Sequence, residues 1–151
     1  MEFIMSDTKS YKIVYQLNEN QKEHLHELYK KEWWCRNRTR RDVDDVLNGS
    51  SFIIGITETE TDTLVGFTRI LTDDFKYAYV YDVIVANENR GQGLGHMLLD
   101  AVVNHPRIKD LKHIELTCAE TKKPFYERYG FSKDYLDSIP MRRANLDAPR
   151  S

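Results

Sequence analysis

Hydrophobic residues recur along this chain with two different spacings, and the spacing changes from segment to segment. Alternating apolar and polar residues are typical of a half-buried strand, whereas apolar residues three and four positions apart are typical of a helix with one buried face. Alternation predicts strands over residues 11–17, 51–58, 64–71, 77–85 and 112–118, with two shorter closing strands over 133–135 and 140–144. Helical spacing predicts a helix after Asn18 or Asn20 and further helices over 42–47, 93–103 and 124–130.

The predicted strand over residues 77–85 is rich in tyrosine and carries a single charged residue, Asp82. Because side chains alternate along a strand, one face is expected to hold Tyr77, Tyr79, Tyr81, Val83 and Val85, and the other Ala78, Val80, Asp82 and Ile84. The tyrosines either pack against a helix with their hydroxyls in water or shape a channel. A lone carboxylate in a central strand is costly unless paired, so Asp82 either pairs with an arginine such as Arg69 or takes part in the chemistry.

This strand leads into a turn in which Arg90 precedes three glycines at alternate positions, Gly91, Gly93 and Gly95. Glycines allow backbone angles that expose successive N–H groups, and the first turn of the following helix adds unpaired N–H groups. Together with the charge of Arg90, these groups suit a pyrophosphate. A dinucleotide fingerprint is excluded because His96 stands where its last glycine belongs, and a nucleotide P-loop because the Gly-Lys-Ser/Thr ending is missing.

The turn Arg90-Gly91-Gln92-Gly93-Leu94-Gly95, after an apolar strand, resembles the pyrophosphate-binding motif of the GCN5-related N-acetyltransferase (GNAT) superfamily. A second match, Pro124-Phe125-Tyr126-Glu127-Arg128-Tyr129-Gly130-Phe131, resembles the segment that closes the same acetyl-coenzyme A (acetyl-CoA) site. One helix and one strand separate the two motifs, as in that family, and the resemblance covers residues 51–131. It implies a single α/β domain with a mixed, mostly antiparallel sheet of six to seven strands, about four flanking helices, and splayed central strands at the acetyl-CoA site.

The resemblance also implies which residues bind the cofactor. They are Val83, Ile84, Val85, Arg90, Gly91, Gln92, Gly93, Leu94, Gly95, His96, Phe125 and Tyr126. Tyr126 matches the tyrosine that the family commonly uses as general acid toward the coenzyme A sulfur, and a phenol with a pKa near ~10 is protonated at neutral pH. The alternative is that Tyr126 only packs. Lys122, Lys123 and Arg128 either hold the outer phosphate of the coenzyme or form a solvated face.

The residue that deprotonates the amine is left open, with Asp82, Glu120, Tyr79 and a chain of waters as alternatives. The segment 33–42 packs two tryptophans and four arginines into ten residues, and it borders the acceptor in the family resembled. It forms either an interhelix turn with solvated arginines or part of an acceptor pocket. The candidate acceptor residues are Trp34, Arg38, Arg40, Tyr79 and Tyr81. Arginines suit an amine that carries a carboxylate, whereas aromatic and acidic groups suit a cationic amine, so the acceptor class stays open.

Composition narrows the remaining choices. A net charge of −2 over 151 residues gives no general field for nucleic acid. The two cysteines are far apart in sequence, and His24 and His26 lack a third ligand, so we expect no disulfide framework and no metal. No signal peptide and no run of ~18 apolar residues is present, which predicts a cytoplasmic protein without a membrane partner.

These observations predict a flexible N-terminus over residues 1–9, an acetyltransferase domain over 10–144 and a flexible tail over 145–151. The predicted function is acetyl-CoA-dependent transfer of an acetyl group to a primary amine of a small molecule or peptide, by direct attack in a ternary complex. The alternative is a non-catalytic acyl-CoA sensor or interaction module. A homodimer is an option that the sequence leaves open.

Overall fold

The computed structural model describes residues 9–134 and 138–149, so most of the predicted N-terminal segment, residues 1–8, lies outside the described residues. The strands are β1 (Tyr11–Val14), β2 (Phe52–Glu58), β3 (Leu64–Thr72), β4 (Tyr77–Val85) and β5 (His113–Glu115). The α-helices are α2 (Glu19–Lys30), α3 (Arg40–Gly49), α4 (Leu94–Val103) and α5 (Lys123–Glu127). Short 3-10 helices, η1 (Asn87–Asn89) and η2 (Glu120–Lys122), precede the glycine turn and α5. No helix in the described residues is both long and apolar enough to cross a membrane.

The strands form one sheet in the order β1-β2-β3-β4-β5, antiparallel except for the parallel pair of β4 and β5. This confirms the mixed, mostly antiparallel sheet, but the expectation of six to seven strands is wrong for the described residues, which form five. Residues 140–144 are not a strand, and the expected strand over 133–135 is absent at 133 and 134, while Tyr135 lies outside the described residues. Met141, the one large apolar side chain of 140–144, is 90% exposed, so this segment has no buried face to dock on the sheet.

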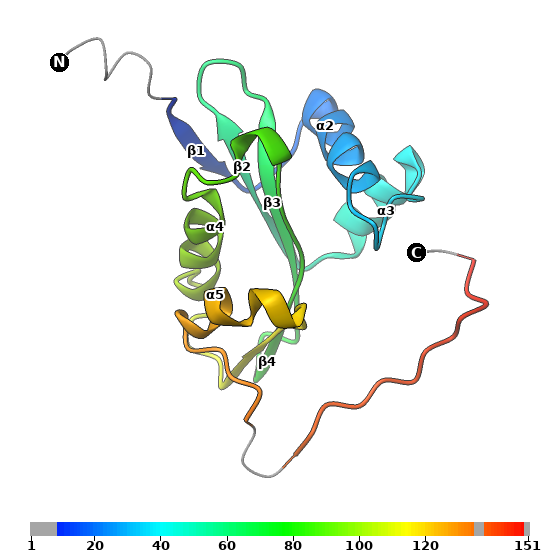
Figure 1. The fold of residues 1–151 in the computed structure, drawn as a ribbon, viewed down its shortest axis with the longest axis vertical. Helices are drawn as coiled ribbons and strands as arrows, with labels where there is room; N and C mark the ends of the chain where they lie inside the picture. The colour runs from blue at the N-terminus through cyan, green and yellow to red at the C-terminus, as the bar shows by residue number, and fades with distance from the viewer. Residues whose placement is uncertain (1–8, 135–137, 150–151) are drawn as a thin grey trace, which may run out of the picture.

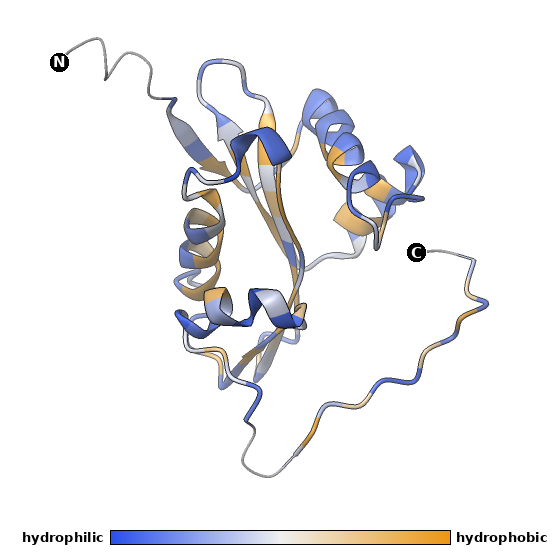
Figure 2. Ribbon diagram, viewed as in Figure 1, coloured by the Kyte–Doolittle hydropathy of each residue, from blue (hydrophilic) through white to orange (hydrophobic). Residues whose placement is uncertain are grey.

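Helices cover both faces of the sheet, with α2 and α3 on one face and α4 on the other (Figure 1). On the first face, the ring of Tyr29 from α2 meets the ring of Phe67 from β3 edge to face at 6.2 Å. On the second, Leu98, Leu99 and Val102 of α4 are fully buried, and Figure 2 shows the apolar side of α4 turned toward the sheet. Burial of each such side chain stabilises the fold by about 1.5–3 kcal/mol.

Side-chain caps define where α2 and α3 begin. Asn18 is the N-cap of α2, because its side chain accepts a hydrogen bond from the Gln21 N–H at 2.8 Å and the Gln21 side chain returns one to the Asn18 N–H. Thr39 and Asp42 form the same reciprocal pair at the start of α3. The loop over residues 31–39, which carries the predicted acceptor residues Trp34 and Arg38, therefore runs into a helix whose start is fixed.

A β-bulge interrupts β4 at Asp82. Phe67 pairs with Ile84 and Arg69 with Tyr81, so Thr68 lies opposite two residues, Asp82 and Val83. Asp82 has a positive φ of 56°, which places it in the left-handed region that few non-glycine residues adopt. The predicted alternation along β4 is therefore wrong beyond Tyr81. Asp82 lies on the same side as Tyr81, where both contact Arg69, and Ile84 rather than Val83 shares that face.

The parallel partner strand β5 accompanies β4 for only a short distance. It pairs with Tyr77–Tyr79, after which the two chains diverge, and the rest of β4 has no neighbour on that side among the described residues. This is the splayed arrangement expected from the sequence. It leaves backbone N–H and C=O groups of the second half of β4 available to a ligand, because they are not used in the sheet.

Candidate active site

A cavity of about 1080 Å³ opens where β4 and β5 diverge. Its lining comes from both faces of the sheet. The glycine turn and α5 contribute from the side of α4, and the loop after α2 contributes from the side of α2. Between these two parts lie side chains of β4, namely Val80, Tyr81, Asp82, Val83 and Val85. The cavity therefore connects the predicted cofactor site to the predicted acceptor site through the opening in the sheet.

Most of the predicted cofactor residues line this cavity. They are Val83, Val85, Arg90, Gly91, Gly93, Leu94, Gly95, His96, Phe125 and Tyr126. Two do not: the Ile84 side chain is buried in the core, and Gln92 turns back to accept a hydrogen bond from the Tyr11 hydroxyl. The contact of Gln92 fastens the glycine turn to β1, at the far edge of the sheet.

The glycine turn has the backbone conformation that its sequence predicts. Gly91 and Gly93 have φ angles of 80° and 79°, and Gly93 is the N-cap of α4. The first helical hydrogen bond of α4 runs from the Met97 N–H to the Gly93 carbonyl, which leaves the N–H groups of the preceding three residues without a partner inside the helix. Gly95 is small for a different reason, since a Cβ there would lie 3.3 Å from Cζ of Phe125. This close approach packs α4 against α5.

Polar contacts hold the glycine turn on both of its sides. Arg90, the predicted pyrophosphate ligand, donates to the Glu32 carboxylate at 3.2 Å and to the Val85 carbonyl at 3.3 Å. An anion bound at this turn would compete with Glu32 for the guanidinium. On the other side of the turn, Nδ1 of His96 lies 2.7 Å from the Tyr129 hydroxyl, which joins α4 to the residues after α5.

Tyr126 lies in the wall of the cavity, and its hydroxyl has no hydrogen-bond partner among the described residues. Burial, followed by the nearby Cys118 thiol, raises the pKa of Tyr126 to about 12. Tyr126 is therefore protonated at neutral pH and has a proton to donate. Cys118 itself is exposed and lines the same cavity, and burial raises the pKa of its thiol.

Asp82 is the centre of a buried polar cluster. Its Oδ2 atom accepts three hydrogen bonds, from the Tyr29 hydroxyl at 2.9 Å, from Nη1 of Arg38 at 2.9 Å and from Nε of Arg69 at 2.8 Å. The Asp82 side chain is only 5% exposed. Of the two alternatives for Asp82, the pairing with Arg69 is confirmed. Because Oδ2 already accepts from three donors, it has no lone pair left for the proton of an amine, and the geometry argues against this oxygen as the base.

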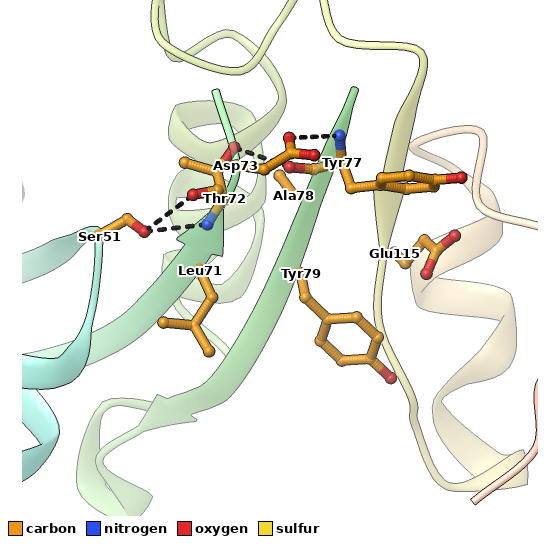
Figure 3. A pocket seen from close by; sticks show the side chains of 8 residues that line it. All are labelled: Ser51, Leu71, Thr72, Asp73, Tyr77, Ala78, Tyr79 and Glu115. Atoms are coloured by element: carbon orange, nitrogen blue, oxygen red, sulfur yellow. Dashed lines mark hydrogen bonds between the residues drawn. The ribbon is translucent and has the colours of Figure 1, made fainter. Parts of the chain in front are cut away.

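Three of the five predicted acceptor residues line the cavity, and two lie outside it. Trp34, Arg38 and Tyr81 line the cavity. Arg40 does not; it forms ion pairs with Glu19, Glu23 and Asp44 on the surface of α2 and α3. Tyr79 lines a separate, more open hollow of about 360 Å³, where Figure 3 shows its side chain between Leu71 and Glu115.

Several lining residues are absent from the candidates that the sequence provides for the cofactor and acceptor sites. They are Glu32, Trp33, Arg69, Arg142 and the segment 116–119 that follows β5. The sequence holds a signal for one of them: Arg69 is the single charged residue of β3, as Asp82 is of β4, and lone charges of opposite sign on neighbouring strands favour a pair. The described residues contain no group of three or more side chains that would hold a metal ion.

A mixed sheet that opens beside a glycine turn and a partly buried tyrosine has the architecture of an acetyltransferase. The family model described as an acetyltransferase (GNAT) domain matches residues 21–140, and the chain belongs to this family. It is 29% identical to an uncharacterized N-acetyltransferase, ycf52, of Pyropia yezoensis over 133 residues, which cover 85% of this chain and 75% of that protein.

Two further comparisons agree. The chain is 28% identical over 103 residues to GCN5-related N-acetyltransferase 3, chloroplastic, of Arabidopsis thaliana, with 68% of this chain and 44% of that protein covered. It therefore spans less than half the length of this relative. A crystal structure of a GNAT-family protein from Xanthomonas campestris superimposes with a TM-score of 0.75 at 24% identity, covering 89% of this chain and 94% of that one. The latter similarity shows the shared fold.

Replacement of Asp82 by alanine is expected to lower the free energy of unfolding by about 3 kcal/mol or more, because two largely buried arginines lose their counter-charge. Asp74→Ala is the matched control. Asp74 also has a positive φ, of 58°, and also pairs with an arginine, but it is 51% exposed. Urea unfolding followed by circular dichroism measures both. Equal losses for the two variants would contradict the importance of the buried cluster.

Gly93→Ala is expected to destabilise the protein by about 1–2 kcal/mol, because alanine is strained at the left-handed φ of this residue. A Cβ at Gly93 has nothing within 4 Å, so crowding contributes nothing to the loss. Gly49→Ala provides the comparison, since its Cβ also has open space and its φ is not in the left-handed region. The thermal midpoint of this second variant should be unchanged or slightly higher. A Gly93→Ala variant as stable as the parent would show that the turn relaxes.

Proposed function

We propose that this protein is an acetyl-CoA-dependent N-acetyltransferase that moves an acetyl group to a primary amine by direct attack in a ternary complex. One observation carries the proposal: a single cavity joins the glycine turn and Tyr126 to a wall of aromatic and arginine side chains on the other face of the sheet. Donor and acceptor can therefore approach each other from opposite faces. Membership of the GNAT family supports acetyl-CoA as the donor.

The diphosphate of the coenzyme is proposed to bind at the N-terminus of α4. The unpaired N–H groups of the first turn and the positive end of the helix dipole stabilise negative charge there. Arg90 and Lys122, which both line the cavity, supply full charges. Arg90 would exchange its contact with Glu32 for one with phosphate.

The thioester is proposed to lie in the opening beside Val83. Backbone N–H groups of β4 on the side that β5 leaves are available to the thioester oxygen, on which negative charge develops as the amine attacks. The amine nitrogen bonds to the carbonyl carbon, the carbon–sulfur bond breaks, and the thiolate leaves. Tyr126 donates its proton to that sulfur.

The proton of the attacking amine is proposed to leave through water in the cavity. Both carboxylates that line the cavity are paired, Asp82 with two arginines and Glu32 with Arg90. Glu120 and Tyr79, the other candidates from the sequence, do not line it. Water is the remaining acceptor among the alternatives that the sequence leaves open.

Tyr126→Phe is expected to lower kcat by roughly 100-fold while the KM for acetyl-CoA stays nearly constant, because a general acid acts in the transition state and not in binding. The assay is release of free coenzyme A thiol over pools of amino acids, polyamines, arylalkylamines, aminoglycosides and peptides. Since the pKa of Tyr126 is about 12, the acid stays protonated below that value, and its loss should cause no fall in rate up to pH 10. Tyr15→Phe, at an exposed tyrosine outside the cavity, is the control.

Full turnover by Tyr126→Phe would remove this residue from the acid role. Absence of thiol release in every pool, together with measured binding of acetyl-CoA, would instead favour a non-catalytic sensor of acyl-CoA. These two outcomes separate the assignment of one residue from the assignment of the activity.

Binding of the coenzyme can also be tested without turnover, through Cys118. The chain has two cysteines, of which Cys35 is 1% exposed and Cys118 lines the cavity. Iodoacetamide should modify Cys118 alone, at a rate that rises with pH as the thiolate forms, and the raised thiol pKa moves this rise to higher pH than for a free cysteine. Saturating acetyl-CoA is expected to slow this modification at least about tenfold, measured by intact-protein mass spectrometry; ATP at the same concentration should not. Equal rates with and without acetyl-CoA would place the coenzyme elsewhere.

A further inference from the structure

We propose that the amine acceptor carries a carboxylate, and that the guanidinium of Arg69 binds this carboxylate inside the cavity. The inference rests on the proposed function and adds the chemical class of its acceptor. Three observations carry it: a buried carboxylate shared between two arginines, one of those arginines held with one edge uncommitted, and the position of that arginine beside the second half of β4.

Asp82 is shared between two arginines. One carboxylate faces two guanidinium groups, whose side chains are only 10% exposed for Arg38 and 16% for Arg69. The third partner, Tyr29, adds no charge, because burial and then the Asp82 charge raise its pKa. Arg69 has no second carboxylate partner among the described residues, so a further anion would be stabilised by its largely buried guanidinium.

Arg69 is oriented by two contacts that leave part of it available. Its Nε donates to Asp82 at 2.8 Å, and its Cζ lies 5.0 Å from the centre of the Tyr81 ring. Its Nη1 and Nη2 groups have no hydrogen-bond partner among the described residues, and Arg69 lines the cavity. The outer edge of a guanidinium donates two parallel hydrogen bonds to a carboxylate, so this arginine presents a preformed fork.

The position of Arg69 suits a small acceptor. Arg69 pairs with Tyr81, two residues before Val83, beside which the thioester is proposed to lie. Two residues of a regular strand correspond to about 7 Å, and the bulge at Asp82 shortens this path. The hydrogen bond to the guanidinium takes up about 3 Å of it and the approach of the amine to the thioester carbon about 3 Å, so few bonds can separate the carboxylate and the amine, as in a free amino acid. A polyamine lacks a comparable partner, since both carboxylates that line the cavity are already paired with arginines.

The first test compares matched acceptors in the thiol-release assay: amino acids, their carboxamides, and the corresponding amines without the carboxyl group. We expect kcat/KM to be at least about tenfold higher for the amino acids. Arg69→Lys keeps a positive charge beside Asp82 but loses the fork, and it should raise KM for amino acids about tenfold with little change for the neutral amines. Arg40→Gln, on the surface outside the cavity, should change neither. Equal or better turnover of carboxamides, or of C-terminally amidated peptides without acidic residues, would overturn the proposal.

A second test needs no turnover. The chain has two tryptophans, Trp33 and Trp34, and both line the cavity, so intrinsic fluorescence reports on its occupation. N-acetylated amino acids, titrated into protein saturated with coenzyme A, are expected to bind at least about tenfold more tightly than their carboxamides, and Arg69→Lys should abolish the difference. Equal affinity would overturn the carboxylate site even if the protein is an acetyltransferase. Selective binding without turnover of any amine would support the site and contradict the catalytic function.

Discussion

The carboxylate of Asp82 is the interaction on which the α2 side of the cavity depends. Its Oδ2 atom joins Tyr29 of α2, Arg38 of the following loop and Arg69 of β3. The carboxylate reaches them because a bulge brings Asp82 to the face that also carries Tyr81. Regular alternation would place it on the side of α4, away from α2. Backbone strain at this residue, with a φ of 56°, is therefore offset by an ion-pair network that sets the wall of the cavity.

The same strand connects this wall to the coenzyme side. Its first three residues are held on both sides by β3 and β5, and beyond Tyr79 it keeps only the partner β3. The sheet thus supplies a rigid base for a stretch of backbone whose hydrogen-bonding groups are free on one side. Catalysis of acyl transfer benefits from donors that are fixed before the reaction, because no energy is then spent on reorienting them. On one edge, β4 diverges from β5; on its other edge, it bulges against β3 at Asp82.

Local features of the sequence predicted the conformation of the glycine turn and the start of α4 well, and long-range features explain where the prediction fails. The glycine turn, the start of α4 and the position of Tyr126 follow from residues within short windows, so spacing alone identifies them. The face on which Asp82 lies depends on a bulge that requires a positive φ, which the backbone disfavours. Arg38 and Arg69 stabilise the bulge through the Asp82 carboxylate, and the Thr68 hydroxyl does so through a hydrogen bond to the Tyr81 carbonyl. Arg40 was expected at the acceptor because it stands near Trp34 in sequence, but it points to Glu19 and Glu23 across the helix pair. The closing strand over 140–144 failed for lack of a buried face.

The charge of the cavity also bears on how an amine becomes a nucleophile. Among the described residues, five cationic side chains line it, Arg38, Arg69, Arg90, Lys122 and Arg142, against two carboxylates. Nearby positive charge disfavours a bound ammonium group and so lowers its pKa, which increases the neutral fraction of an amine that enters. A carboxylate on the acceptor would bring the molecule to Arg69 while its amine, directed toward β4, remains near that guanidinium. On this argument the arginine cluster both selects the acceptor and assists loss of its proton to water, and no protein carboxylate is needed as a base.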